Sequence, residues 1–288
     1  MKCIDRSGKI VEEGTAQARI VRFLYANVAG RIVLKVLTRP CISKMAGRLL
    51  DSRASVALIS GFVKSNDIDL SEYEKCDYRS FNDFFTRRIR AERRRIDPDS
   101  NVLIAPCDSR LTVYDIDEGS RFEIKGRPYT MEELVHSRKL AKRYRGGKLL
   151  LFRLTVRDYH RYCYVDSGRK SKNYRLPGVL HTVHPIAAGE RPIYKENARE
   201  FSLLKTERFG TVLMMQVGAL LVGRIVNHHQ GAKVRRGEEA GMFQYGGSTV
   251  ILCLEPGRAM IDSDILSNSA AGAETRVLMG ERIGICGE

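Results

Sequence analysis

The sequence lacks several features that would place it in a familiar class of protein. It has no tryptophan and six histidines, and its 34 acidic side chains are outnumbered by 49 lysines and arginines. Nowhere do about 18 apolar residues follow one another, the length that a helix needs to cross a bilayer, so no spanning segment is expected. The first fourteen residues have no apolar core, so a secretory signal is not expected either.

The cysteines form no metal-binding or disulfide pattern. Their number is odd and no two of them make a C-x-x-C pair, which argues against a zinc ribbon and against a framework of disulfides. A reducing, cytosolic environment is therefore expected. The seven cysteines are Cys3, Cys41, Cys76, Cys107, Cys163, Cys253 and Cys286.

The net charge of +15 predicts attraction to polyanions, which include nucleic acids, anionic lipids and acidic substrates. A basic cluster runs from Arg87 to Arg95. The sequence nevertheless has no zinc-finger, KH or RRM signature and no interleaving of basic and aromatic residues. These absences argue against nucleic acid as the partner, and leave lipid and small acidic substrates.

A basic, amphipathic region precedes the rest of the chain. Residues 1–64 contain twelve lysines and arginines against four acidic residues. From Thr15 to Lys64 the apolar side chains recur at helical spacing, with Pro40 expected to end one helix and Asp51-Ser52 to begin another. One interpretation is a helical cap on a core, and the other is a pair of helices whose apolar face enters a membrane surface. Both interpretations can hold at once. The apolar stripe is Val21, Leu24, Val28, Ile32 and Val36.

After Pro98 the pattern changes to β-rich runs separated by glycine, proline, asparagine and aspartate. Ser80 and Asp83 predict a capping box for a short helix before that point, and residues 131–143 form the clear helical window after it. The predicted fold class is therefore α+β, with a helical region over 1–98 and a mostly antiparallel β body over 99–288.

Three short motifs carry residues suited to catalysis. Gly246-Gly247-Ser248-Thr249 precedes a buried apolar run, Pro106-Cys107-Asp108 lies between two β runs, and Asp158-Tyr159-His160-Arg161 lies between two more. Each alone is most simply a turn or a structural residue. A glycine before a serine also permits the close approach that an attack by the hydroxyl on the preceding carbonyl needs.

In the order P-x-D, then D-Y-H-R, then G-S-T along the chain, the motifs resemble those of the phosphatidylserine decarboxylases, in the bacterial form with GGST. The resemblance also includes VRRGEEAGMF at 234–243, SFNDFFTRRIR, FEIKGRPYT, VGALLVGRI and ETRVLMGERIG, and covers the chain from about residue 20 to its end. It implies a body similar to a lipoyl-type barrel. A true lipoyl domain carries its cofactor on a lysine at a hairpin tip, whereas the nearest lysine here, Lys233, precedes the turn.

The resemblance implies a proenzyme that cuts itself between Gly247 and Ser248. The products are a β chain, 1–247, and an α chain, 248–288, whose first residue becomes a pyruvoyl group. His160 and Asp108 would form a relay like that of serine proteases, with the carboxylate holding the imidazole. The pyruvoyl carbonyl then forms a Schiff base with phosphatidylserine and acts as the electron sink for loss of CO2, which gives phosphatidylethanolamine.

One position departs from the pattern of the family. Many members have a second histidine three residues after D-Y-H, where this chain has Cys163. His160 is therefore the expected base, with Cys163, His181 and His184 as auxiliary candidates. The H-x-x-H spacing of the last two would direct their rings to opposite faces of a strand, so no metal site is expected.

The predicted partners are phosphatidylserine and an anionic membrane surface, at the cytoplasmic face of the cell membrane, with no nucleic acid. Assembly into a homodimer is left open. Arg157, Arg161 and Lys125 are candidates for holding the phosphate headgroup, on charge alone. The alternatives are a pyruvoyl decarboxylase for another serine phospholipid or a soluble amino acid, and a protein that cleaves itself without later chemistry.

Overall fold

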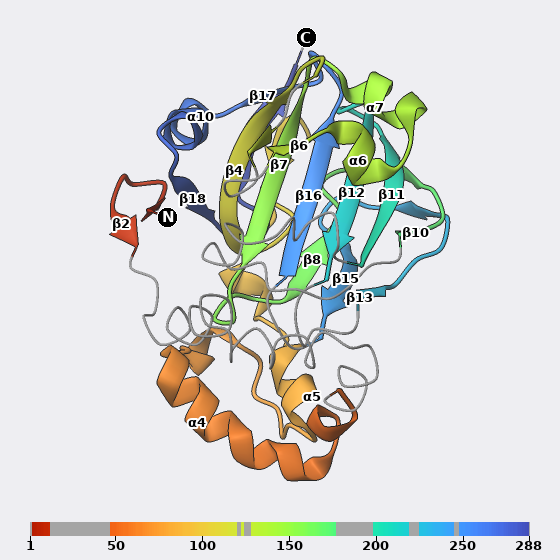
Figure 1. Cartoon of the computed structure of the whole chain (residues 1–288). Coiled ribbons are helices and arrows are strands. Elements are labelled where there is room, and N and C mark those ends of the chain that lie inside the picture. The colour runs from red at the N-terminus through yellow and green to blue at the C-terminus, as the bar shows by residue number, and fades with distance from the viewer. Residues whose placement is uncertain are drawn as a thin grey trace, which may run out of the picture.

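The protein was studied as a computed structural model that describes residues 2–11, 47–119, 122–123, 128–176, 198–218, 225–244 and 248–287. Figure 1 shows two regions: a strand-rich body, and a helical region over residues 47–98 that lies against one end of it. Most of the amphipathic stretch predicted for Thr15 to Lys64 lies outside the described residues, and so do His181, His184, Lys125 and Gly247.

In the part of the chain that the structure describes, the body is built around one large sheet of eleven strands. All its strand pairs are antiparallel except that of β1 with β18, which brings Cys3 opposite Glu274. In spatial order the strands are β14 (Ala232–Val234), β9 (Gly168–Lys170), β11 (Arg199–Thr206), β12 (Thr211–Val217), β16 (Ser248–Leu254), β7 (Gly147–Leu154), β4 (Ser109–Ile116), β18 (Glu274–Val277), β1 (Cys3–Ile4) and β2 (Ile10–Val11), with β10 (Tyr174–Leu176) beside β11.

The central strands β12, β16 and β7 are apolar on both faces, because both faces of the sheet are covered. Successive side chains of a strand point to opposite faces. Leu150, Phe152, Val250 and Leu252 pack into one cluster of buried residues, whereas Leu149, Leu151, Ile251 and Cys253 pack into a second cluster on the other face. This double burial explains why these strands form continuous apolar runs in the sequence instead of alternating.

Smaller sheets cover the first face. One contains β13 (Ile225–Asn227), β15 (Glu239–Phe243) and β8 (Arg161–Cys163), and another contains β17 (Ala259–Ile261), β19 (Arg282–Cys286) and β3 (Val102–Ile104). A two-stranded ribbon joins β5 (Phe122–Glu123) and β6 (Pro128–Tyr129). The α+β class with mostly antiparallel strands is confirmed. Within the described ranges the sheets are open, so the lipoyl-like barrel is not confirmed.

Three helices among the described residues belong to the body. The helical window predicted over 131–143 forms two helices, α6 (Met131–Val135) and α7 (Arg138–Tyr144), which pack on the second face. His136 divides them, because it adopts a left-handed conformation with φ of 52° and Ser137 caps the second helix. The third helix, α10 (Ser263–Ala270), lies beside β4 and β18.

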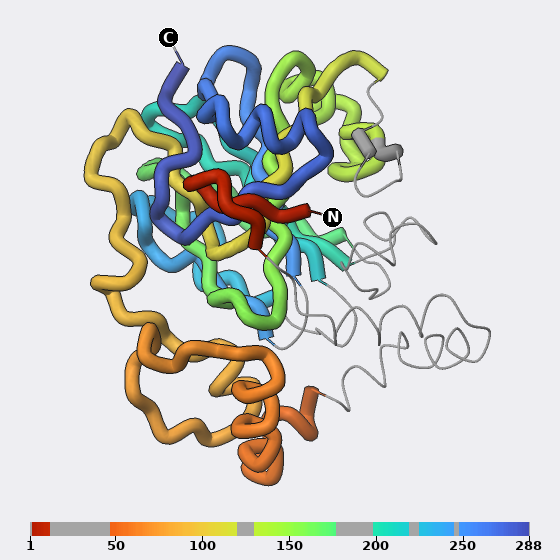
Figure 2. Tube along the Cα trace, turned by 90° about the vertical axis from the view of Figure 1, so that its left-hand side faces the viewer, coloured from red at the N-terminus to blue at the C-terminus, as the bar shows by residue number. Residues whose placement is uncertain are grey.

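The helical region consists of short elements: η1 (Arg53–Val56), α4 (Ala57–Asn66), η2 (Leu70–Glu72), α5 (Phe81–Phe85) and η3 (Ala91–Arg93). They share a third cluster of buried residues, which contains Ile68, Tyr73, Phe81, Phe84, Phe85 and Ile89, together with Tyr159 of the body. Figure 2 shows this region below the body, joined to it by the chain that leads into β3. Among the described residues, no helix has the length and apolar character needed to span a bilayer.

The capping box predicted for α5 is present in a modified form. The Ser80 hydroxyl accepts the backbone N–H of Asp83 at 3.1 Å, and the Asp83 carboxylate accepts the N–H of Arg79, one residue earlier than in the usual box. The basic cluster after α5 is not a solvated surface throughout. Arg87 is buried, with its guanidinium 4.1 Å from the centre of the Tyr73 ring, and Arg94 is bonded to carboxylates.

Candidate active site

Ser248 is the first residue of β16, at the centre of the large sheet. It pairs with Leu154 of β7 and is fully buried. Its side chain shares a face with Val250 and Leu252, the face covered by the sheet of β8 and β15. The strand therefore fixes the serine and directs its hydroxyl into the space between the two sheets.

His160 immediately precedes β8, on the sheet that covers that face. Its carbonyl accepts the N–H of Phe243, the last residue of β15, at 2.9 Å. Its ring is buried, its Nδ1 lies 2.8 Å from the carbonyl oxygen of Asp158, and its ring centroid lies 4.0 Å from that of Phe85.

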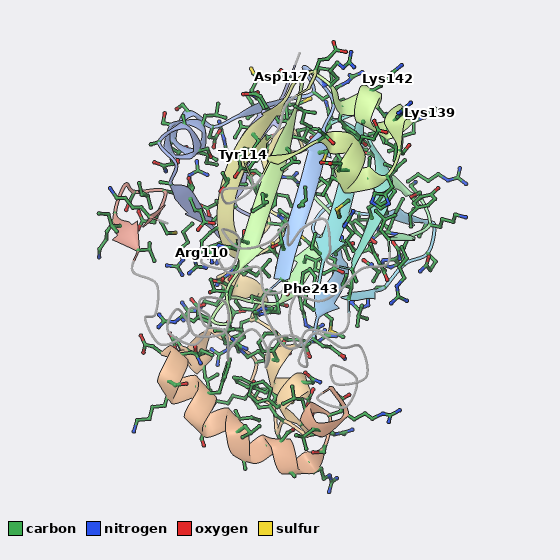
Figure 3. The ribbon with its side chains drawn as sticks, viewed as in Figure 1. Arg110, Tyr114, Asp117, Lys139, Lys142 and Phe243 are labelled. Carbon is green, nitrogen blue, oxygen red and sulfur yellow. The ribbon has the colours of Figure 1, made fainter. Side chains whose placement is uncertain are left out.

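These connections bring His160 and Ser248 to one end of the sheet. Phe243 is bonded to His160 and is only five residues before Ser248, while Leu154 is paired with Ser248 and is only six residues before His160. Arg110 and Phe243, labelled in Figure 3, both lie at the end of the sheet that faces the helical region. The predicted nucleophile and the predicted base thus share one neighbourhood.

Asp108 lies in the same neighbourhood but is held by other groups. In the part of the chain that the structure describes, its carboxylate accepts hydrogen bonds from the Arg94 guanidinium, at 2.6–2.9 Å, and from the backbone N–H of Met279 at 2.8 Å, rather than from His160. Burial raises the pKa of the Asp108 carboxyl above its ordinary value, an effect that Arg94 opposes. The direct relay of Asp108 and His160 stays a prediction.

Asp158 is the residue that the sequence analysis named within a motif without giving it a role. Its carbonyl faces His160, and its carboxylate accepts from Arg110 at 2.6 Å and from the backbone N–H and hydroxyl of Thr155. The carboxylate thereby fixes the turn that aims the carbonyl. The sequence signal that could have pointed to this role is the position of Asp158 two residues before His160 in D-Y-H-R.

Cys163 is buried on β8, next to the buried Cys107 in one core cluster. Burial raises the pKa of the Cys163 thiol to about 12 and also raises the pKa of the Cys107 thiol. Both thiols are therefore protonated at neutral pH and suit a packing role. The auxiliary role of Cys163 stays a prediction.

The two described arginines suggested for the headgroup differ in their surroundings. Arg161 is engaged: its guanidinium donates to the carbonyl of Thr86 at 2.7 and 2.9 Å and to the Glu239 carboxylate at 2.7 Å. Arg157 is half-buried in the turn before His160, and no ion pair holds it among the described residues. The headgroup assignment stays a prediction, and Arg157 is the better placed of the two.

Comparison of the chain with known proteins tests what this arrangement of serine, histidine and aspartate belongs to. The phosphatidylserine decarboxylase family model matches residues 81–285. The chain belongs to the phosphatidylserine decarboxylase family. The match includes all three motifs, the α5 segment and the body apart from β1, β2 and the last residues.

Curated proteins agree with this assignment over nearly their whole lengths. The chain is 44% identical over 266 residues to phosphatidylserine decarboxylase proenzyme 2 of Clostridium acetobutylicum, covering 92% of this chain and 91% of the relative. It is 39% identical over 279 residues to the phosphatidylserine decarboxylase proenzyme of Clostridium botulinum, with 95% and 94% covered. For that of Fusobacterium nucleatum the identity is 38% over 286 residues, with 97% and 95% covered. The resemblance seen in the sequence is confirmed, and with it the prediction of a decarboxylase.

Proposed function

We propose that this phosphatidylserine decarboxylase family member converts phosphatidylserine to phosphatidylethanolamine and CO2, after cutting its own chain before Ser248. The observation that carries the proposal is a fully buried serine, at the start of a central strand, in the same neighbourhood as a buried histidine. The family match and the proenzyme names of the relatives support the same reaction.

The first stage breaks the bond between Gly247 and Ser248. The Ser248 oxygen bonds to the Gly247 carbonyl carbon while a base takes its proton, and the C–N bond breaks to leave an ester. Loss of the Ser248 α-proton then expels the upstream chain as a carboxylate. Water replaces the nitrogen of the resulting dehydroalanine, ammonia leaves, and a pyruvoyl group remains. His160 is the proposed base, with Asp108 as the carboxylate that stabilises its charged form.

The second stage uses that group at the start of β16. A pyruvoyl carbonyl supplies the electron sink that loss of a carboxylate as CO2 requires. The site fits such a group, because β12 and β7 hold β16 on both sides and the first residue of the strand is shielded from water. The new chain end therefore stays fixed after the cut.

Mass spectrometry of the denatured protein tests the first stage. Wild-type protein should give a chain of residues 1–247 and a pyruvoyl-blocked chain of residues 248–288 that reacts with a hydrazide. Ser248→Ala should leave one uncut chain, and His160→Ala should slow cutting by about a hundredfold or more. A wild-type protein that stays whole, with serine at position 248, would contradict the proposal. Two fragments without a hydrazide-reactive ketone would favour self-cleavage without later chemistry.

A lipid substrate is favoured over a soluble amino acid by the surface of the helical region. Of the seven large apolar side chains that are strongly exposed among the described residues, four lie between residues 49 and 70: Leu49, Val56, Leu58 and Leu70. The basic residues Arg48, Arg53 and Lys64 are exposed among them. Apolar side chains ringed by cations suit the headgroup layer of an anionic membrane. We therefore place the enzyme peripherally, at the cytoplasmic face, where its free thiols also fit.

Flotation with vesicles that contain phosphatidylserine tests this placement with two matched variants. Leu58 and Met260 are 52% and 53% exposed, the first on α4 and the second on β17 of the body. Leu58→Glu should reduce the bound fraction severalfold, whereas Met260→Glu should float like the wild type. If the two variants bind equally, α4 is not the docking surface. If wild-type protein ignores the vesicles and decarboxylates a soluble amino acid, the lipid assignment fails.

A further inference from the structure

The imidazole of His160 is fixed from two directions by groups with no assigned role. Its Nδ1 lies 2.8 Å from the carbonyl oxygen of Asp158. The ring of Phe85 lies against the imidazole, with 4.0 Å between the centroids and 45° between the planes. The first contact fixes the edge of the imidazole and the second its tilt.

The contact with Asp158 determines where the ring carries its proton. A carbonyl oxygen can only accept a hydrogen bond, so Nδ1 must be the donor. A neutral imidazole has one N–H, and its lone pair is therefore on Nε2. The ring is held as the tautomer in which Nε2 is the basic nitrogen, which is the requirement for taking a proton from a hydroxyl at that end.

Phe85 reaches His160 because the neighbouring residues Thr86 and Arg161 hold α5 against the body. The carbonyl of Thr86, the next residue after Phe85, accepts two hydrogen bonds from Arg161, the next residue after His160. The ring of Phe85 also contacts α4, where Phe62 meets it edge-on at 6.5 Å between centroids. Two consecutive residues of the helical region, Phe85 and Thr86, thus contact two consecutive residues of the body, His160 and Arg161.

We propose that Phe85 is a positioning residue for the self-cleavage step, acting with the Asp158 carbonyl to hold His160 in the Nδ1–H tautomer and at the required tilt. The proposal rests on the proposed function, in which His160 is the base. It makes the helical region part of the cleavage apparatus as well as a docking surface. Small displacements of a catalytic group lower rates steeply, so a lost ring contact is measurable even when the fold survives.

Phe84 provides a matched control for Phe85. Both side chains lie on α5 and are 0% exposed, but the Phe84 ring packs on Phe62, Tyr78 and Phe81 and not on the imidazole. Leucine at either position keeps most of the apolar volume and removes the aromatic face. A role limited to packing predicts that the two substitutions have similar effects.

The rate of self-cleavage should separate the two variants. Phe85→Leu should cut about tenfold to a hundredfold more slowly than the wild type, and Phe84→Leu within a few-fold of it. Phe85→Tyr keeps the ring face while burying an extra hydroxyl, so it should cut faster than Phe85→Leu even where it is less stable. Equal rates for Phe84→Leu and Phe85→Leu, or a Tyr variant slower than the Leu variant, would overturn the proposal.

A second measurement needs no change at Phe85. In the uncut Ser248→Ala protein, nitrogen NMR of labelled histidines should show His160 with a protonated Nδ1 and a bare Nε2 at neutral pH, assigned by loss of its signals in the double variant with His160→Ala. The opposite tautomer would overturn the proposal. The His160→Ala single variant keeps the two claims apart: normal cutting there would remove His160 as the base and the proposed function would need another one, whereas blocked cutting with no effect of Phe85→Leu refutes only the positioning role.

Discussion

The body and the helical region hold themselves together by different means. The body has a continuous ladder of strands with apolar clusters on both faces of its large sheet, and a buried ion pair, Arg153–Glu274, joins two of its strands. The helical region has short elements around one aromatic cluster, and α4 has no buried residue of its own. The body thus fixes where Ser248 lies, and the smaller region adds an outward apolar surface and a ring on His160.

The difference teaches which changes should spread and which should stay local. A defect in the ladder affects strands that are distant in sequence, since their pairs share a sheet. A defect in the helical region reaches the body only through contacts across the boundary, which include the bonds of Arg161 to Thr86 and of Arg94 to Asp108. Breaking one group in each region therefore tests the comparison.

The largest effect is expected at the buried ion pair of Arg153 and Glu274, which joins β7 to β18. Both side chains are almost fully buried. Glu274→Ala leaves a charge without its partner in the interior and should lower the free energy of unfolding by about 3–5 kcal/mol. Chemical denaturation of the uncut Ser248→Ala protein measures this change for a single chain.

The control for this pair is Glu132, whose bond to Arg138 lies in water. Glu132→Ala should cost less than about 1 kcal/mol, because exposed ion pairs are screened. If both substitutions cost the same, the buried pair does not contribute through burial, and the contrast between interior and surface charge is wrong.

A pH-dependent effect of intermediate size is expected at Lys170 of β9. Its ammonium is buried and donates to the carbonyls of Ser171 and His229 and to the Asn173 side chain, and burial lowers its pKa to about 8 from 10.5. Between these two values the unfolded chain binds a proton that the folded protein does not. Unfolding then takes up a proton, so stability rises with pH across this window.

Lys170→Met removes this titration. From pH 8 to pH 10.5 the wild type should gain about 2 kcal/mol of stability relative to the variant, measured by denaturation at each pH. Parallel stability curves for the two proteins would show that the amine keeps an ordinary pKa in the folded state.

The smallest effect is expected at the cap of α5. Ser80→Ala removes the acceptor for the Asp83 N–H and should cost about 1 kcal/mol, which speeds hydrogen exchange in α5 about fivefold. Amides of β7 and β16 should exchange as in the wild type, because the loss stays within the helical region. Ser60→Ala, at an exposed position of α4, should leave both regions unchanged. Equal acceleration in the body would show that the two regions unfold as one unit.

Much of the body could be predicted from the sequence because its signals are local. Runs such as KLLLFRLTV and STVILCLE mark β7 and β16 through their apolar, β-branched content. The Ser80 cap, the α4 segment and the sites of the three motifs follow from short patterns in the same way. The order of strands in the sheet depends on contacts between distant residues, and no single run contains that information.

The contacts of the candidate site were the harder part. Asp108 was predicted to hold His160. Its carboxylate accepts hydrogen bonds from the Arg94 guanidinium and from the backbone N–H of Met279, because a turn of the helical region meets the loop after β18 there. Arg236, in the turn at VRRGEE, likewise donates to the carbonyls of Asp97, Val102 and Val165. In both cases the bonding partners lie elsewhere along the chain, so the spacing of residues within the motif could not predict these hydrogen bonds.

The place of β16 between β12 and β7 also bears on the order of folding and self-cleavage. The α chain would contribute a strand with neighbours on both sides, and its β18 is flanked by β4 and by β1 from the very start of the polypeptide. If the chain is cut before Ser248 as proposed, folding must come first, because a free segment of 41 residues (288 minus 247) would have to insert between two strands of a finished sheet. The two pieces would then stay joined through the pairs of β16 and β18 for as long as the sheet stays folded.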